Sequence, residues 1–111
     1  MSELETIIAT LGVERSANLF HSILPLINAR RYELLECLYN QDWDGAAQHA
    51  HKLLATGHLL GSQHLLEQLM LIEKHDTSTI LELNFINQLT AEIDSGLKQL
   101  TQYSQLNQRP Q

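Results

Sequence analysis

Residues 50–61 read AHKLLATGHLLG, a helical run of apolar and small residues with a histidine near its start and a glycine at its end. With 3.6 residues per turn, one face of this helix should point to the core and consist of Ala46, Ala50, Leu53, Gly57 and Leu60. His51 flanks that face, so its ring is expected to be partly supported and partly exposed. Gly61 suits the left-handed residue that often closes a helix.

The rest of the chain also reads as helix, because apolar residues recur at steps of three and four and no segment shows the period of a strand. The expected helices cover residues 2–10, 14–40, 42–60, 62–74 and 80–103. Gly12 stops the first helix, and Asp42 and Ser62 are expected N-caps. Pro25 is expected to kink or restart the long helix. The pattern predicts an all-α fold, an antiparallel four-helix bundle with a short additional N-terminal helix.

Length and composition fit one globular domain, since the chain has 111 residues, 43% hydrophobic and 18% charged. We expect this domain to cover residues 1–104 and the polar end, 105–111, to form a flexible tail. No apolar run approaches the roughly 20 residues that span a bilayer, and the acidic start does not resemble a signal peptide. These features and the lone Cys37 predict a cytoplasmic location. Met1 and the polar tail favour a free-standing protein.

Charge and composition exclude several kinds of partner. The net charge of −6 leaves no basic face for phosphate backbones, so nucleic acid is not expected. The 6 histidines include no His–x₃–His pair and the chain has no cysteine cluster, so no metal site is predicted. No Gly-rich phosphate loop is present, which excludes a kinase and predicts no cofactor. We expect a monomer that binds another protein and does not contact a membrane.

The candidate site is His51 with the residues that share its helical face. These residues would form the surface on which a partner docks, and they are Ala47, Gln48, Leu54, Ala55 and His58. From His51 to Gly61 the helix rises about 15 Å, and the same length along an antiparallel neighbour reaches residues 71–73, where Glu73 is the ionisable side chain. A carboxylate that accepts the Nδ1–H of His51 would fix its tautomer and leave Nε2 free as a nucleophile.

A family resemblance follows from the spacing of His51, Leu53 and Gly61, preceded by Asp42-Trp43 and followed by apolar positions such as Leu65 and Leu69. This pattern, over roughly residues 14–75, resembles the histidine phosphotransfer (HPt) domains of bacterial and fungal phosphorelays. The resemblance implies that His51 accepts a phosphoryl group from a receiver-domain aspartate and passes it to another receiver. It also implies that Glu73 orients His51, and that the partners are response-regulator receiver domains, a hybrid sensor kinase, or both.

Two positions depart from the HPt motif. The family lysine three residues after the histidine is Leu54 here, and the glycine after that lysine is Ala55. Lys52 is expected on a different face of the helix, whereas His58 lies two turns above His51 and could supply charge when protonated. Because Leu54 would extend an apolar docking surface, a second hypothesis is a non-catalytic HPt-like module that docks receiver domains without relaying phosphate.

Overall fold

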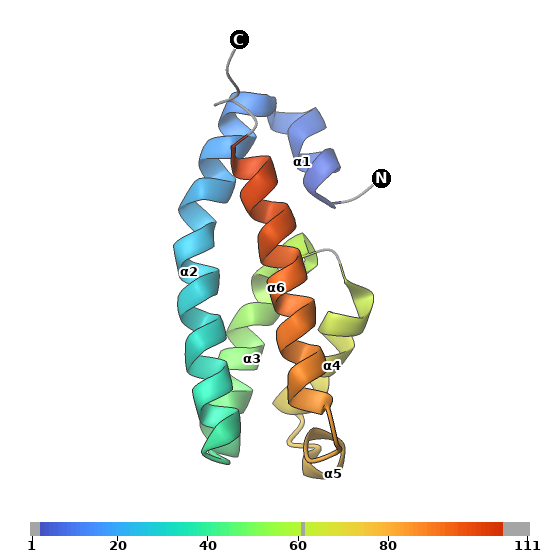
Figure 1. Ribbon diagram of the computed structural model, residues 1–111. Helices are drawn as coiled ribbons and strands as arrows, with labels where there is room; N and C mark the ends of the chain where they lie inside the picture. Colours follow the sequence, from blue (N-terminus) through green and yellow to red (C-terminus); the bar gives the residue numbers. More distant parts are fainter. Residues whose placement is uncertain (1–2, 61, 106–111) are drawn as a thin grey trace.

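The computed structural model describes residues 3–60 and 62–105, and the regular structure within these ranges is entirely helical (Figure 1). The elements are α1 (Glu3–Leu11), α2 (Val13–Tyr39), α3 (Trp43–Gly57), a 3₁₀ helix η1 (His58–Leu60), α4 (Gln63–Glu73), α5 (Thr77–Ile80) and α6 (Phe85–Ser104). The predicted all-α class is confirmed. None of the helices in the described ranges is both long and apolar enough to cross a bilayer.

The four longest helices contact one another in a closed ring, in the order α2, α3, α4, α6 and back to α2. In Figure 1, α2 and α6 run side by side along the long axis of the molecule, and α3 lies behind them. The helix α1 folds back at one end of α2, and α5 lies at the opposite end, below α4. The molecule is elongated, with extents of 50 × 24 × 21 Å.

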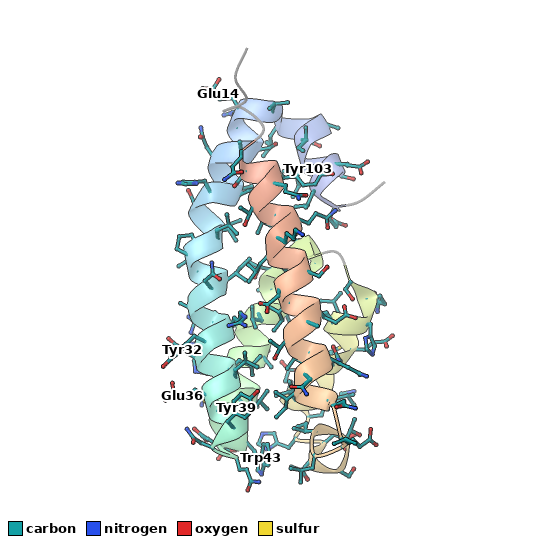
Figure 2. The ribbon with its side chains drawn as sticks, viewed as in Figure 1. Glu14, Tyr32, Glu36, Tyr39, Trp43 and Tyr103 are labelled. Atoms are coloured by element: carbon teal, nitrogen blue, oxygen red, sulfur yellow. The ribbon has the colours of Figure 1, made fainter. Side chains whose placement is uncertain are left out.

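The core is a column of aliphatic side chains to which each of these four helices contributes. Fully buried examples are Leu34 on α2, Leu53 on α3, Leu69 on α4 and Leu89 on α6. Burial of such side chains is the main favourable term in folding. At one end of the column, Phe20 packs edge-on against Tyr103, with ring centroids 6.4 Å apart and an interplanar angle of 84°. Figure 2 shows Tyr103 near the end of α6, beside α1.

Local signals set most of the helix boundaries. The Asp42 side chain accepts the backbone N–H of Gly45 at 3.0 Å, and the Ser62 hydroxyl accepts the N–H of Leu65 at 3.1 Å. Both residues are N-caps, as predicted. Gly12 has φ 86°, a left-handed value that favours glycine, and it separates α1 from α2 as expected. The predicted closing residue Gly61 and residues 106–111 of the predicted tail lie outside the described residues.

Pro25 does not restart the long helix, because α2 is assigned as one helix of 27 residues that contains it. Proline removes one backbone donor from the helix interior. Phe20 and Ile27, which lie before and after it on α2, are both buried in the core at 1% exposure or less. Side chains on both sides of the proline are therefore anchored in the core.

The single helix expected over residues 80–103 is wrong in its first turn. The short helix α5 ends at Ile80, an irregular turn follows, and α6 begins at Phe85. Asn84 precedes α6 with φ 73°, a left-handed conformation that asparagine tolerates better than most residues. Leu83 fits the helical apolar period in sequence but is 91% exposed, so it lies in the turn and not in the core.

A close approach fixes the end of the α3–α4 hairpin against α6. A Cβ atom added at Gly96 would lie 2.6 Å from the Cβ and 2.7 Å from the carbonyl oxygen of Leu60. Only a glycine allows η1 to pack this tightly on α6. This contact sets how the hairpin that bears His51 sits on the rest of the molecule.

Candidate functional site

His51 lies on the outer face of α3, where its side chain is 76% exposed. The opposite face of the helix is buried and consists of Ala46, Ala50, Leu53 and Gly57. Leu60, in η1, is buried as well. The predicted core-facing stripe is therefore confirmed. Because Ala46 and Ala50 are small, α3 can approach its neighbours closely while His51 stays accessible from outside.

The structure brings His51 together with Glu73, the last residue of α4. The Nδ1 atom of His51 contacts Oε2 of Glu73, whose side chain is 37% exposed. A carboxylate that accepts the Nδ1–H holds the ring in one orientation and keeps the proton on that nitrogen. Among the described residues, Nε2 of His51 has no hydrogen-bond partner. This nitrogen is thus oriented, unprotonated in the neutral ring and open to solvent.

A hollow of about 480 Å³ lies beside the imidazole. It is lined by Ala47, Gln48, His51, Lys52 and Glu73. Two of the candidate docking residues, Ala47 and Gln48, are therefore next to the histidine. Lys52, which was expected on a different face of the helix, lines the same hollow. A long, flexible side chain one position after the histidine can reach around the helix, which a pattern of helix faces does not capture.

The other three candidate docking residues lie apart from this hollow. Ala55 and His58 are exposed but do not line it. Leu54 is half-buried and packs against the hydrophobic core, so only part of its surface is available to a partner. The apolar docking surface expected around Leu54 is correspondingly smaller than the sequence suggests.

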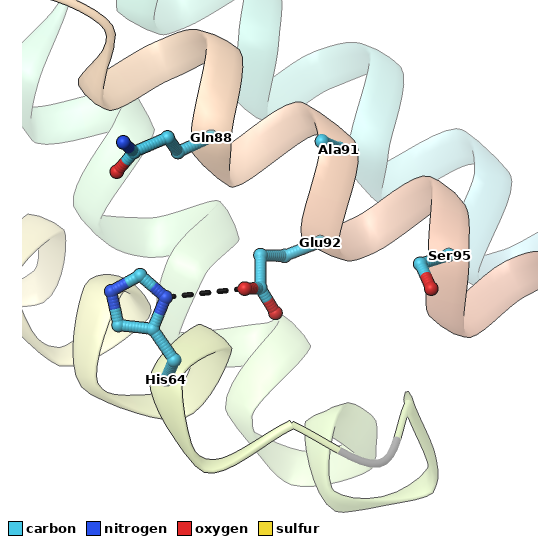
Figure 3. Close-up of a pocket in the computed structure, with 5 residues that line it drawn as sticks. All are labelled: His64, Gln88, Ala91, Glu92 and Ser95. Atoms are coloured by element: carbon cyan, nitrogen blue, oxygen red, sulfur yellow. Dashed lines mark hydrogen bonds and ion pairs between the residues drawn. The ribbon is translucent and has the colours of Figure 1, made fainter.

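A second polar cluster, which the sequence did not reveal, joins the start of α4 to α6. The Ser62 hydroxyl donates to Oε2 of Glu92 at 2.5 Å. Nδ1 of His64 lies 3.2 Å from Oε1 of the same carboxylate (Figure 3). Hydrogen bonds from Ser62 and then from His64 lower the pKa of Glu92 below its ordinary value. The carboxylate is therefore ionised at neutral pH and holds two partners at once.

Two further histidines pair with carboxylates. Nδ1 of His49 lies 3.2 Å from Glu33, and Arg30 lies 3.4 Å from the same nitrogen. His75 contacts Asp44 through Nε2, at 3.7 Å. Within the described part of the chain, no three or more His, Cys, Asp or Glu side chains converge as a metal site would require.

The environment of Cys37 gives it no reactive character. Burial, followed by the nearby charge of Asp42, raises the pKa of its thiol. A raised pKa keeps the sulfur protonated at neutral pH, and the thiol is a weaker nucleophile than the thiolate. The half-buried cysteine therefore packs beside the start of α3 and takes no part in the His51–Glu73 or His64–Glu92 contact.

No protein-family profile, curated protein or solved structure matches this chain. What the chain can do is therefore inferred from its own residues and from the geometry of its two exposed histidine–glutamate pairs.

Proposed function

We propose that this chain is a histidine-containing phosphotransfer protein of a two-component phosphorelay. In this proposal His51 accepts a phosphoryl group from a receiver-domain aspartate and passes it to another receiver. The ring of contacts among α2, α3, α4 and α6 is then an HPt-type four-helix bundle. The partners are receiver domains of response regulators or of a hybrid sensor kinase, and the cytoplasm is the proposed place of action.

The observation that carries this proposal is the contact between Nδ1 of His51 and Glu73 beside an open hollow. Three properties of this arrangement suit a phosphoacceptor. The ring is 76% exposed, so a folded partner can reach it. Glu73 orients the ring, and Ala47 leaves the approach to Nε2 free of bulk. A nucleophilic histidine needs this combination of access, orientation and a free nitrogen.

The transfer step needs only the imidazole of this chain as the nucleophile. The lone pair of Nε2 forms a bond to phosphorus while the bond from phosphorus to the aspartyl oxygen breaks, and the carboxylate leaves with the electron pair. The imidazolium that forms is positive, and the ionised carboxylate of Glu73 beside Nδ1–H stabilises it. The receiver is expected to supply the metal ion and the cationic groups that position the phosphoryl oxygens.

Lys52 supports this proposal at the point where the sequence departs from the HPt motif. The family lysine is replaced by Leu54, which is half-buried against the core. Lys52 lines the hollow together with His51 and Glu73. We propose that this ammonium group attracts the phosphoryl oxygens in place of the missing lysine.

The test is phosphoryl transfer to the full chain from a panel of phosphorylated receiver domains. The expected product is label that is stable in alkali and lost in acid. Label should disappear in His51→Gln and remain in His58→Gln, a matched control that changes another exposed histidine. Glu73→Gln should slow transfer about ten-fold, since it removes the charge from a charge-assisted hydrogen bond.

Persistence of receiver-derived label in His51→Gln would overturn the proposal. A different result would favour the second candidate, a docking module that binds receivers without relaying phosphate. In that case the wild-type chain binds a phosphorylated receiver, and His51→Gln weakens the binding, but neither chain takes up label. The apolar Leu54 at the position of the family lysine is the observation that favours this candidate.

A further inference from the structure

The His64–Glu92 pair repeats the atomic arrangement of the His51–Glu73 pair at the opposite end of α4. His64 is the second residue of α4, and its Nδ1 atom faces the Glu92 carboxylate on α6 at 3.2 Å. The side chain of His64 is 55% exposed, and that of Glu92 is 31% exposed. Nε2 of His64 has no hydrogen-bond partner among the described residues. A ring held at Nδ1 with Nε2 open is the arrangement that makes an imidazole a directed nucleophile.

A separate hollow of about 460 Å³ lies beside this ring. It is lined by His64, Gln88, Ala91, Glu92 and Ser95. Figure 3 shows His64 on α4 facing Glu92 on α6, with Gln88 and Ser95 on either side of Glu92 along α6. The Gln88 amide and the Ser95 hydroxyl are donors suited to phosphoryl oxygens. The first turn of α4, which contains His64, adds the positive end of a helix dipole.

The other two paired histidines are less suited to act as nucleophiles. His49 is only 18% exposed, and Glu33 and Arg30 both contact its Nδ1 atom. His75 contacts its carboxylate through Nε2, so the nitrogen that would act as the nucleophile is engaged. His49 also lines a hollow, but among the described histidines whose Nδ1 contacts a carboxylate, only His51 and His64 are more than half exposed.

We propose that His64 is a second site of histidine phosphorylation, at which Nε2 takes a phosphoryl group from a small activated phosphoryl donor. The lone pair of Nε2 forms a bond to phosphorus while the bond to the leaving group breaks, and the leaving group departs with the electron pair. When the donor is phosphoramidate, the leaving group is ammonia. The proton on Nδ1 stays shared with Glu92, which balances the positive charge of the phosphorylated ring. This site goes beyond the relay proposed for His51 and does not depend on it.

The hollow beside His64 lacks the lysine that lines the hollow beside His51. This difference determines the relative rates of phosphorylation that we expect. The residues that line the first hollow include Lys52, whereas those that line the second include no cation. The second site therefore attracts a phosphoryl dianion less well. We expect phosphorylation to be fastest at His51, slower at His64 and slowest at His58, which is exposed and has no carboxylate partner among the described residues.

The experiment uses phosphoramidate with the full chain and its variants. Intact mass counts the phosphoryl groups, and ³¹P NMR separates Nε2-phosphohistidine from the Nδ1 isomer. His51→Gln should still take one group, on Nε2 of His64, and His51→Gln/His64→Gln should lose it. Adding Glu92→Gln to the His51→Gln chain should slow labelling of His64 about ten-fold without changing the slow labelling of His58. Urea unfolding of each variant checks that all are folded.

Three results would overturn the proposal: labelling of His64 no faster than that of His58, no effect of Glu92→Gln, or a phosphoryl group on Nδ1. Failure of this site and failure of the relay are distinguishable. If His64 is labelled by phosphoramidate but His51 takes nothing from any receiver, the relay fails and the second site stands. If His51 is labelled by a receiver but His64 resists phosphoramidate, the relay stands and the second site fails.

Discussion

The two histidine–glutamate pairs lie at opposite ends of α4, which supplies the glutamate of one and the histidine of the other. Glu73 contacts His51 on a broad, open face, and the histidine is 76% exposed. Glu92 is shared between Ser62 and His64, and it ties the start of α4 to α6. Both pairs join two helices, but the carboxylate of the second pair also holds the N-cap residue Ser62.

This difference shows what decides the use of a histidine–carboxylate pair. An exposed pair contributes little to stability, because water and salt screen its charges. A pair whose carboxylate also binds a helix cap stabilises the packing of two helices. We therefore expect His51–Glu73 to matter mainly for chemistry, and His64–Glu92 to matter for both chemistry and stability.

The largest effect should come from the core of the helix that both sites share. Leu69 is fully buried in the middle of α4, so Leu69→Ala should lower the free energy of unfolding by about 2–5 kcal/mol. Both sites should lose activity together as α4 loosens. Met70→Ala, on the exposed side of the same helix, is the matched control and should change stability little. Urea unfolding measures both, and equal effects would contradict the assigned packing.

The second-largest effect should come from disturbing the close contact between Gly96 and Leu60. Gly96→Ala forces a Cβ atom into the Leu60 backbone, and we expect a loss of about 1–3 kcal/mol in unfolding free energy. Phosphorylation of His64 should suffer more than that of His51, because the strain falls on α6 beside Glu92. Gln99→Ala, at an exposed position on the same helix, is the control for a change to alanine and should alter stability little. An unchanged stability of Gly96→Ala would show that η1 does not pack closely on α6.

The hydrogen bonds of Glu92 should make the stability of the fold depend on pH. Hydrogen bonds from Ser62 and His64 lower the pKa of Glu92 from its ordinary 4.5. Because the pKa in the folded chain is below that in the unfolded chain, ionised Glu92 stabilises the fold above pH 4.5, and this contribution is lost as pH falls through the lowered value. Glu92→Gln should cost about 1 kcal/mol at neutral pH and nothing in acid.

Glu73→Gln is the control for this pH experiment. Its carboxylate is more exposed, so the substitution should change the free energy of unfolding by only about 0–1 kcal/mol at neutral pH. Chemical unfolding of the two variants across the acidic range provides the measurement. Parallel curves for Glu73→Gln and Glu92→Gln would show that the Ser62–Glu92–His64 bridge adds no stability of its own.

The smallest effect should come from placing at position 54 the lysine that the HPt motif has there. Leu54→Lys adds a cation near His51, and the lifetime of its phosphohistidine should rise about two- to five-fold, as expected for one exposed ion pair. Phosphorylation of His64 should not change. Leu54→Met keeps the apolar character and serves as the control. An unchanged or shorter lifetime in Leu54→Lys would mean that Lys52 already supplies the charge, or that Leu54 is a docking contact.

Features of this protein that depend on local chemistry could be predicted from the sequence. The apolar period of three and four predicts helices, and side-chain oxygens at Asp42 and Ser62 mark where two of them begin. The buried face of α3 follows from the same period. Even the approach of Glu73 to His51 follows from counting along two consecutive antiparallel helices. Because the connection between them is short, a given distance before it on the first helix lies opposite the same distance after it on the second.

Other features were decided only by the tertiary structure. His64 and Glu92 are 28 residues apart, and their helices, α4 and α6, are separated by α5 and an irregular turn, so no counting along the chain predicts their contact. Their meeting depends on how α4 and α6 are shifted relative to each other, which is set by core packing and by the close approach of Leu60 to Gly96. The interruption of the helix between Ile80 and Phe85 also depends on tertiary packing. Leu83 continues the apolar period, and only the packing of the whole chain determines that it stays in solvent.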